Sequence, residues 1–137
     1  MREVIFQSDI TAVLIDAVPF LVVDLETGEI LYASRPFERM LKYTVRGELV
    51  GMNVDDLVPE ELQPRHIEYR DSYAANPIDR AMGPSPVLAG RCRDGSKVAL
   101  EIGLYPCVLS RRRCVLAVAL ALPKRQSAVG EQESKAT

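Results

Sequence analysis

Apolar side chains take every second position over one stretch in the C-terminal third of the chain: Val98, Leu100, Ile102 and Leu104. A period of two is typical of a β-strand with one covered face. An Asp-Gly turn at Arg93-Asp94-Gly95 joins this strand to an earlier run over residues 87–92, and a connection at residues 110–113 returns the chain as a third strand over 114–121. The pattern therefore predicts three consecutive antiparallel strands.

A second pair of strands is predicted near the N-terminus. Residues 20–24 and 29–33 are short β-rich runs, joined by Leu25-Glu26-Thr27-Gly28. Gly28 can adopt positive φ without steric cost, so we expect a tight hairpin here.

Helical segments are predicted between these two groups of strands. Three short ones are expected: residues 35–42 after an N-cap at Ser34, residues 44–51 between Thr44 and Gly51, and residues 54–58. The one substantial helix is predicted over Pro64–Ala75, because proline suits the first helical turn and Asn76-Pro77 ends the pattern.

Four apolar residues recur at helical spacing before the first strand: Phe6, Ile10, Val13 and Leu14. We expect an amphipathic cap helix within residues 1–19, whose apolar stripe must be covered. Either the sheet of the same chain covers it, or the same helix of a second subunit does, in which case these four residues form a dimer interface. Residues 123–137 are polar and lack apolar periodicity, so we expect a disordered tail.

The order of elements favours an α+β domain over residues 20–122. Hairpins at both ends of the domain are most simply combined in one five-stranded antiparallel sheet, with the short helices and the longer helix on one face.

Composition narrows the class of function. The 137 residues suit one domain, and 17 basic against 19 acidic residues provide no basic field for binding nucleic acid. The longest apolar run, residues 114–122, is too short for a membrane helix, which needs about 20 residues. Three cysteines, at 92, 107 and 114, lack metal-site spacing and suit a reduced, cytoplasmic protein. The basic cluster Arg111–Arg113 is interpreted as a hairpin tip in water.

Catalytic motifs are missing from the sequence. The chain has one histidine, no Gly-rich phosphate loop and no Gly-x-Ser-x-Gly motif, so we expect no enzyme activity. The acidic pair Asp55-Asp56 is interpreted as solvated helix caps.

Several short segments, in this order and with these gaps, are similar to the PAS superfamily over residues 20–121. The resemblance is closest to PAS modules of bacterial two-component histidine kinases, including haem-bearing oxygen sensors. The segments that carry it are Asp24-Leu25-Glu26-Thr27-Gly28-Glu29-Ile30, Ala33 through Tyr43, Gly47-Glu48-Leu49-Val50-Gly51, Leu57-Val58-Pro59-Glu60, Pro64-Arg65-His66, Arg80-Ala81-Met82-Gly83, Gly90-Arg91-Cys92-Arg93-Asp94-Gly95 and Leu100-Glu101-Ile102.

The resemblance implies a pocket between the inner face of the sheet and the longer helix. Leu62, His66, Tyr69 and Tyr73 share one helical stripe, so we expect them to face the sheet. The ligand pocket is predicted to include His66, Tyr69, Tyr73, Leu57, Leu88 and Ile102, and the wider candidate set adds Val22, Tyr32, Phe37, Leu100 and Val118.

The resemblance also implies a sensory or interaction module in bacterial signalling. Such a module acts through ligand-biased or constitutive association with itself, as a homodimer, and with a kinase or regulator. The pocket holds no cofactor, a small organic ligand, or haem b with His66 as the axial ligand to the iron, as in oxygen-sensing relatives. Flavin is not expected, because the segment Gly51–Asp56 lacks the reactive cysteine of photoactive domains.

Overall fold

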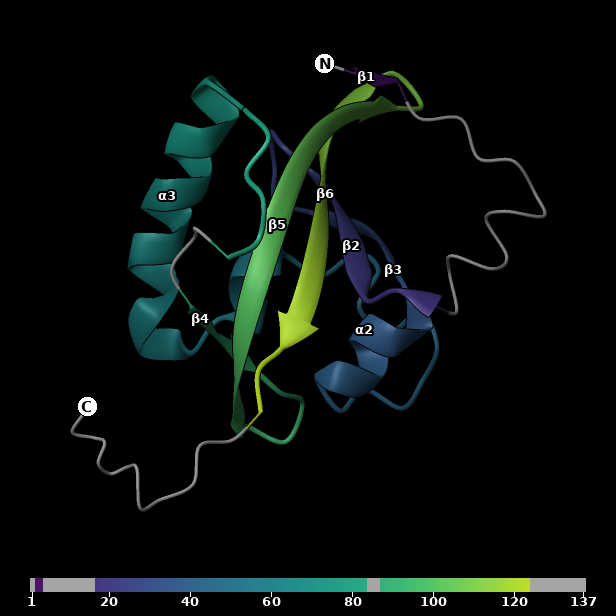
Figure 1. Ribbon diagram of the computed structural model, residues 1–137, viewed down its shortest axis with the longest axis vertical. Helices are drawn as coiled ribbons and strands as arrows, with labels where there is room; N and C mark the ends of the chain where they lie inside the picture. The colour runs from purple at the N-terminus through teal and green to yellow at the C-terminus, as the bar shows by residue number, and fades with distance from the viewer. Residues whose placement is uncertain (1, 4–16, 84–86, 124–137) are drawn as a thin grey trace.

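The computed structural model describes residues 2–3, 17–83 and 87–123 (Figure 1). The strands are β1 (Arg2–Glu3), β2 (Phe20–Asp24), β3 (Ile30–Ala33), β4 (Leu88–Arg91), β5 (Lys97–Leu109) and β6 (Arg112–Ala121). The helices are α2 (Arg35–Met40), α3 (Gln63–Ala75) and two 3₁₀ turns, η1 (Val54–Leu57) and η2 (Glu60–Leu62).

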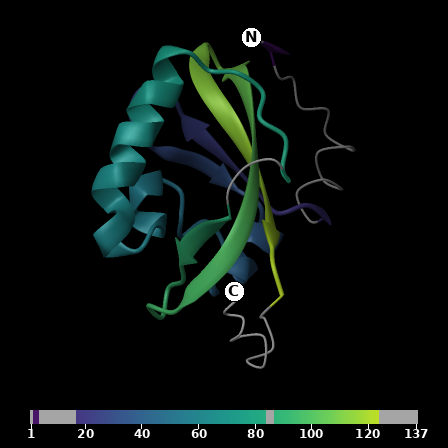
Figure 2. The same ribbon diagram turned by 60° about the vertical axis from the view of Figure 1, so that its left-hand side comes forward.

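The five predicted strands form one antiparallel sheet in the spatial order β4-β5-β6-β2-β3. The centre of the sheet is β6, which pairs with β5 from Leu100↔Ala121 to Leu109↔Arg112 and with β2 from Phe20↔Val118 to Asp24↔Cys114. The predicted fold class is confirmed. The long helix α3 lies along one face of this sheet (Figure 2).

Three separate segments lie along the outer edge of β5. β4 pairs with residues 97–100 of β5, a bridge joins Arg80 to Leu104 with two backbone hydrogen bonds of 2.8 Å, and β1 pairs in parallel with Cys107 and Val108. Arg2 and Glu3 therefore extend the sheet by a short parallel strand that the sequence did not predict. The predicted stripe Phe6, Ile10, Val13 and Leu14, and the tail beyond Pro123, lie outside the described residues.

The first helix begins as the sequence predicts. Ser34 Oγ accepts hydrogen bonds from the amides of Phe20 at 2.9 Å and Phe37 at 3.4 Å, and it donates to the Val18 carbonyl at 2.7 Å. The cap therefore fixes the start of α2 against β2. The predicted helix over residues 44–51 is wrong: residues 46–51 are successive turns, because positive φ at Gly47 and Gly51 interrupts helical hydrogen bonding.

The sheet buries apolar side chains on both faces. The inner cluster joins β2, β3 and β6 to the helices through residues such as Leu21, Val23, Phe37 and Leu57. The outer cluster contains Phe20, Val22, Cys107 and Cys114, with Tyr32 and Val118 packed against them. Val22, Tyr32 and Val118 were predicted to line the pocket, and this is wrong. All five residues of β2 are buried, so no polar alternation in the sequence marks its inner face.

The basic cluster at the β5–β6 hairpin is not simply solvated, in contrast to the sequence-based interpretation. Arg112 pairs with Asp24 at 2.9 Å and Glu29 at 3.2 Å, and Arg113 pairs with Glu26 at 3.0 Å. These bonds tie the β5–β6 hairpin to the β2–β3 hairpin. Helices of the length and apolar character that a bilayer requires do not occur in the described part of the chain.

Candidate functional site

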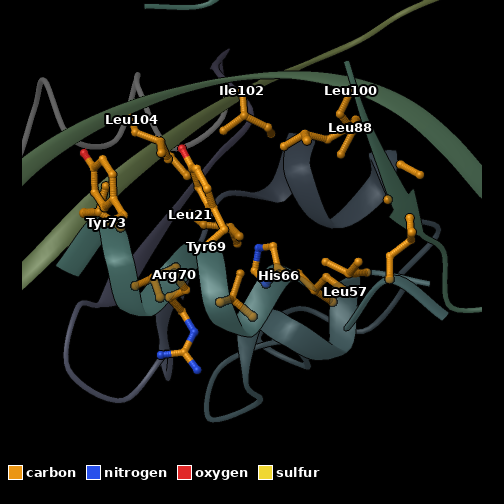
Figure 3. Close-up of a pocket in the computed structure, with 18 of the residues that line it drawn as sticks. Leu21, Leu57, His66, Tyr69, Arg70, Tyr73, Leu88, Leu100, Ile102 and Leu104 are labelled. Atoms are coloured by element: carbon orange, nitrogen blue, oxygen red, sulfur yellow. The ribbon is translucent and has the colours of Figure 1, made fainter. Parts of the chain in front are cut away.

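A cavity of about 560 Å³ lies between α3 and the inner face of the sheet (Figure 3). This volume is in the usual range of small-molecule sites. Its wall is mainly apolar, and the six residues predicted for the pocket all contribute to it: Leu57, His66, Tyr69, Tyr73, Leu88 and Ile102. That they bind a ligand stays a prediction.

Polar side chains interrupt this apolar wall at a few places. From α3 come Arg65, His66, Tyr69, Arg70 and Tyr73, and the connection after α3 contributes Arg80. Four of these residues, at positions 66, 69, 70 and 73, follow the spacing of one helical face, so α3 presents them together. The histidine and the two tyrosines rise towards the sheet, whereas the guanidinium of Arg70 points away from it (Figure 3).

His66 is held by a buried carboxylate. Its Nδ1 lies 2.6 Å from Asp55 Oδ1, and the two side chains are 24% and 10% exposed. Asp55 is positioned by η1, where Asn53 accepts a hydrogen bond from the Asp55 amide at 2.9 Å as the N-cap. The sequence-based interpretation of Asp55 as a solvated cap is therefore wrong, since its carboxylate binds α3.

The charge state of Asp55 decides which nitrogen of His66 is free. Burial alone would raise the pKa of Asp55, but hydrogen bonds from Arg70 and His66 outweigh burial and hold that pKa below its ordinary value of 3.8. An ionised carboxylate only accepts, so Nδ1 of His66 carries a proton. In the neutral imidazole, Nε2 then keeps its lone pair on the opposite edge of the ring.

Arg70 supports Asp55 from the side away from the cavity. Its Nε and a terminal nitrogen donate to the two carboxylate oxygens at 3.2 and 2.9 Å. The guanidinium in turn lies against Gly28 in the β2–β3 turn: a Cβ there would be 3.0 Å from Arg70 Cζ. His66 is thus connected through Asp55 and Arg70 to the first hairpin of the sheet.

Tyr69 and Arg80 form a second polar group at the cavity. A terminal nitrogen of Arg80 donates to the Tyr69 hydroxyl, and the Arg80 guanidinium carbon lies 5.4 Å from the centre of the Tyr69 ring. Tyr69 is 42% exposed, and Leu88 on the neighbouring β4 is 43% exposed. Since both also line the cavity, its opening to solvent lies on this side.

Tyr73 closes the other end of the helix. Its hydroxyl donates to the Ile78 carbonyl at 2.5 Å and ties the end of α3 to the connection that follows. Burial, helped by the nearby charge of Asp79, raises the pKa of Tyr73 to about 12, so this hydroxyl keeps its proton at neutral pH. Tyr73 therefore lines the cavity and holds the end of α3 against the connection that follows it.

Sequence reasoning missed three arginines of this site: Arg65, Arg70 and Arg80. Arg65 and Arg70 lie within the predicted helix, but charged residues on a helix are expected to face water. Arg80 lies in an irregular segment, and only its pairing with Leu104 in the folded sheet brings it to the cavity. The arrangement offers an apolar volume, one imidazole nitrogen and a guanidinium near the opening.

Comparisons with known proteins agree with this architecture. A family model described as PAS fold matches residues 10–102. Oxygen sensor protein DosP of Escherichia coli (strain K12) is 32% identical over 79 residues, which are 58% of this chain and 10% of that protein.

Two solved structures are similar in fold. The PAS domain of a Colwellia psychrerythraea protein matches with a TM-score of 0.69 at 19% identity, covering 86% of this chain and 98% of that one. The PAS domain of an HTR-like protein from Haloarcula marismortui matches with a TM-score of 0.67 at 18% identity, covering 84% and 96%. The five-stranded sheet, the cavity beneath α3 and a family model that spans most of the chain lead to one conclusion: this chain belongs to the PAS family.

Proposed function

We propose that this sensory PAS domain binds a small, mainly apolar ligand in the cavity beneath α3 and reports its presence to a partner protein. The observation that carries the proposal is the cavity of about 560 Å³, lined mainly by apolar side chains, with His66, Tyr69 and Arg80 among its polar groups. Burial of a ligand against that wall supplies affinity, and the few polar groups supply orientation. The domain acts by binding and not by catalysis.

A change in ligand occupancy has a physical route to the sheet. His66 is bonded to Asp55, Asp55 to Arg70, and Arg70 lies against the β2–β3 turn. A ligand that prefers one position of the imidazole therefore shifts the balance between two arrangements of this turn. We propose that the sheet transmits this shift to a kinase or a regulator.

Native mass spectrometry tests whether the cavity takes a ligand. The protein, purified without denaturant, is expected to show a mass excess that disappears on denaturation. Ile102→Trp, which fills the cavity from β5, should abolish the excess, while Leu120→Trp, at a 49% exposed position of β6, should retain it. No mass excess in the wild type, together with equal uptake of a hydrophobic fluorophore by both variants, would contradict the proposal.

A second candidate function is haem-based sensing with His66 as the axial ligand, and the His66–Asp55 bond favours it. Histidines that bind metals commonly donate their other ring nitrogen to a carboxylate, which fixes the tautomer. Here Nδ1 is bound by Asp55, Nε2 is left with its lone pair, and the surrounding wall is apolar. The residues present therefore fit the group: His66 would hold the iron, and Leu57, Leu100 and Ile102 would surround the macrocycle.

When bound, haem would supply a site for a diatomic gas or a one-electron redox change. The chain's own contributions are separate: Asp55 orients His66, and the apolar wall limits the access of water. Its matched relative in Escherichia coli is named an oxygen sensor protein, which supports this candidate. The chain corresponds to only about a tenth of that protein, so the relative's full activity is not carried over.

Absorption spectroscopy tests the haem candidate. Protein from haem-replete cells is expected to show a Soret band that disappears in His66→Ala and persists in the exposed control Arg46→Gln. A spectrum without a Soret band, after incubation with excess hemin as well, would remove haem and leave a colourless ligand.

The partner in this proposal is a second copy of the chain together with a signalling protein. The support is the apolar stripe Phe6, Ile10, Val13 and Leu14 of the sequence. Light scattering after size-exclusion chromatography tests it: the wild type should be a dimer and Ile10→Asp with Leu14→Asp a monomer. A dimer that survives both substitutions would exclude this segment as the interface.

A further inference from the structure

Arg80 is fixed beside the cavity by its backbone. Its amide and carbonyl exchange two hydrogen bonds with Leu104 of β5, each 2.8 Å long. Leu104 itself lines the cavity, so the Arg80 side chain starts from the sheet edge that forms one wall. The position of the guanidinium is therefore set by the sheet and does not depend on a flexible loop alone.

The guanidinium is held by a neutral side chain. It donates one N–H to the Tyr69 hydroxyl, and its guanidinium carbon lies over the Tyr69 ring, 5.4 Å from the ring centre. Neither contact neutralises the charge. Within the described residues, no carboxylate lies within ion-pair distance of Arg80, whereas the guanidinium of Arg70, one turn away from His66, is paired with Asp55.

Among the residues that the structure describes, no further group takes up the other donors of this pair. A guanidinium has five N–H donors in a planar fork that matches a carboxylate, and the Tyr69 hydroxyl, which accepts from Arg80, still has its own O–H to donate. These donors adjoin a mainly apolar volume near its opening. A group that accepts several hydrogen bonds and carries a negative charge would complement them.

From this arrangement we infer that Arg80 and Tyr69 form a carboxylate subsite, and that the ligand is an amphipathic monocarboxylate of the fatty-acid type. The apolar body lies between α3 and the sheet, and the carboxylate binds at the opening. The inference rests on the proposed ligand-binding function and specifies its ligand class. A porphyrin propionate offers the same carboxylate chemistry, so hemin is a separate arm of the experiment.

Isothermal titration calorimetry with decanoate and with decanol, its neutral analogue, tests the subsite. A charge-assisted hydrogen bond is worth about tenfold or more in affinity, so the wild type should prefer decanoate by at least that factor. Arg80→Gln should remove the preference while changing decanol affinity by less than about threefold. Tyr69→Phe should weaken decanoate binding partly, and Arg46→Gln, an exposed arginine outside the cavity wall, should match the wild type.

The outcomes distinguish failure of the carboxylate subsite from failure of the ligand-binding function. If the wild type binds decanol and decanoate equally well, or if Arg80→Gln keeps the preference, the subsite is wrong and the ligand-binding function stands. If the wild type binds neither probe nor hemin, the proposed function itself fails. A third outcome is that the wild type binds hemin but not decanoate, and that Arg80→Gln weakens hemin binding at least about tenfold. This result would overturn the fatty-acid assignment and identify the bound carboxylate as a porphyrin propionate.

Discussion

Asp55 Oδ1 lies 2.6 Å from Nδ1 of His66, and this bond joins the 3₁₀ turn η1 to the helix α3 across one wall of the cavity. The second oxygen of the same carboxylate binds Arg70, one turn further along α3. One buried carboxylate therefore orients the only histidine of the chain and neutralises an arginine.

Replacing Asp55 with alanine should destabilise the protein by about 2–3 kcal/mol, because it leaves the largely buried guanidinium of Arg70 with only the exposed carboxylate of Asp71 at 3.7 Å and removes the partner of His66. Urea unfolding followed by circular dichroism measures the loss. Asp56→Ala is the matched control, since its side chain is exposed and should change stability by less than about 0.5 kcal/mol. Equal losses in both variants would contradict a special role for Asp55.

The contribution of Asp55 to stability should depend on pH in one direction. Its pKa in the folded protein lies below the ordinary value of 3.8, so the contribution is fully present above that value. It is lost as the pH falls from about 4 through the lower folded pKa. The difference in unfolding free energy between wild type and Asp55→Ala should therefore shrink between pH 5 and pH 2, to be measured by urea unfolding at each pH. A constant difference would indicate packing alone.

Gly28 should be more sensitive to substitution than Gly47. Both have positive φ, +82° and +84°, so alanine is strained at either by about 1–2 kcal/mol. At Gly47 an added Cβ meets nothing within 4 Å, but at Gly28 it meets Arg70 at 3.0 Å and Asn53 at 3.1 Å. Gly28→Ala should therefore lower the urea midpoint further than Gly47→Ala. It should also shift the ¹⁵N resonances of His66, which Gly47→Ala should leave unchanged.

The tip of the β5–β6 hairpin should accept a stabilising substitution. Ser110 and Arg111 both have positive φ, 51° and 64°, which suits a two-residue turn but is unfavourable for side chains with a Cβ. Arg111→Gly should raise the unfolding free energy by about 0.5–1 kcal/mol, as measured by thermal unfolding. Arg46→Gly, at an exposed residue without positive φ, should destabilise instead.

Much of the fold could be predicted from the sequence because its turns carry strong local signals. Gly95 after Asp94 and Gly28 after Thr27 both adopt the positive φ that their hairpins require, and Pro64 lies in the first turn of α3 as expected. The segment after Thr44 misled the prediction, because glycines that could end a helix equally permit a series of turns.

Only the part of the candidate site that lies on a single helix could be predicted from the sequence. His66, Tyr69 and Tyr73 share a helical face, so periodicity placed them together. Asp55 is eleven residues from His66, on another element, and no local pattern relates the two. Likewise, β2 is buried on both faces, so the sequence does not distinguish Val22, on the outer face, from Leu21, on the inner face.

The covered edge of β5 limits how this domain can bind other chains by strand pairing. Exposed strand edges recruit extended peptides and, in partly unfolded proteins, seed edge-to-edge aggregation. Here β4, the Arg80 bridge and β1 already occupy the edge at residues 97–100, Leu104 and residues 107–108. An incoming strand would find too few free amides there to add itself to the sheet. Recognition by β-augmentation is thereby disfavoured along β5, so an extended peptide would have to pair with β3 or β4, the two strands at the ends of the sheet order.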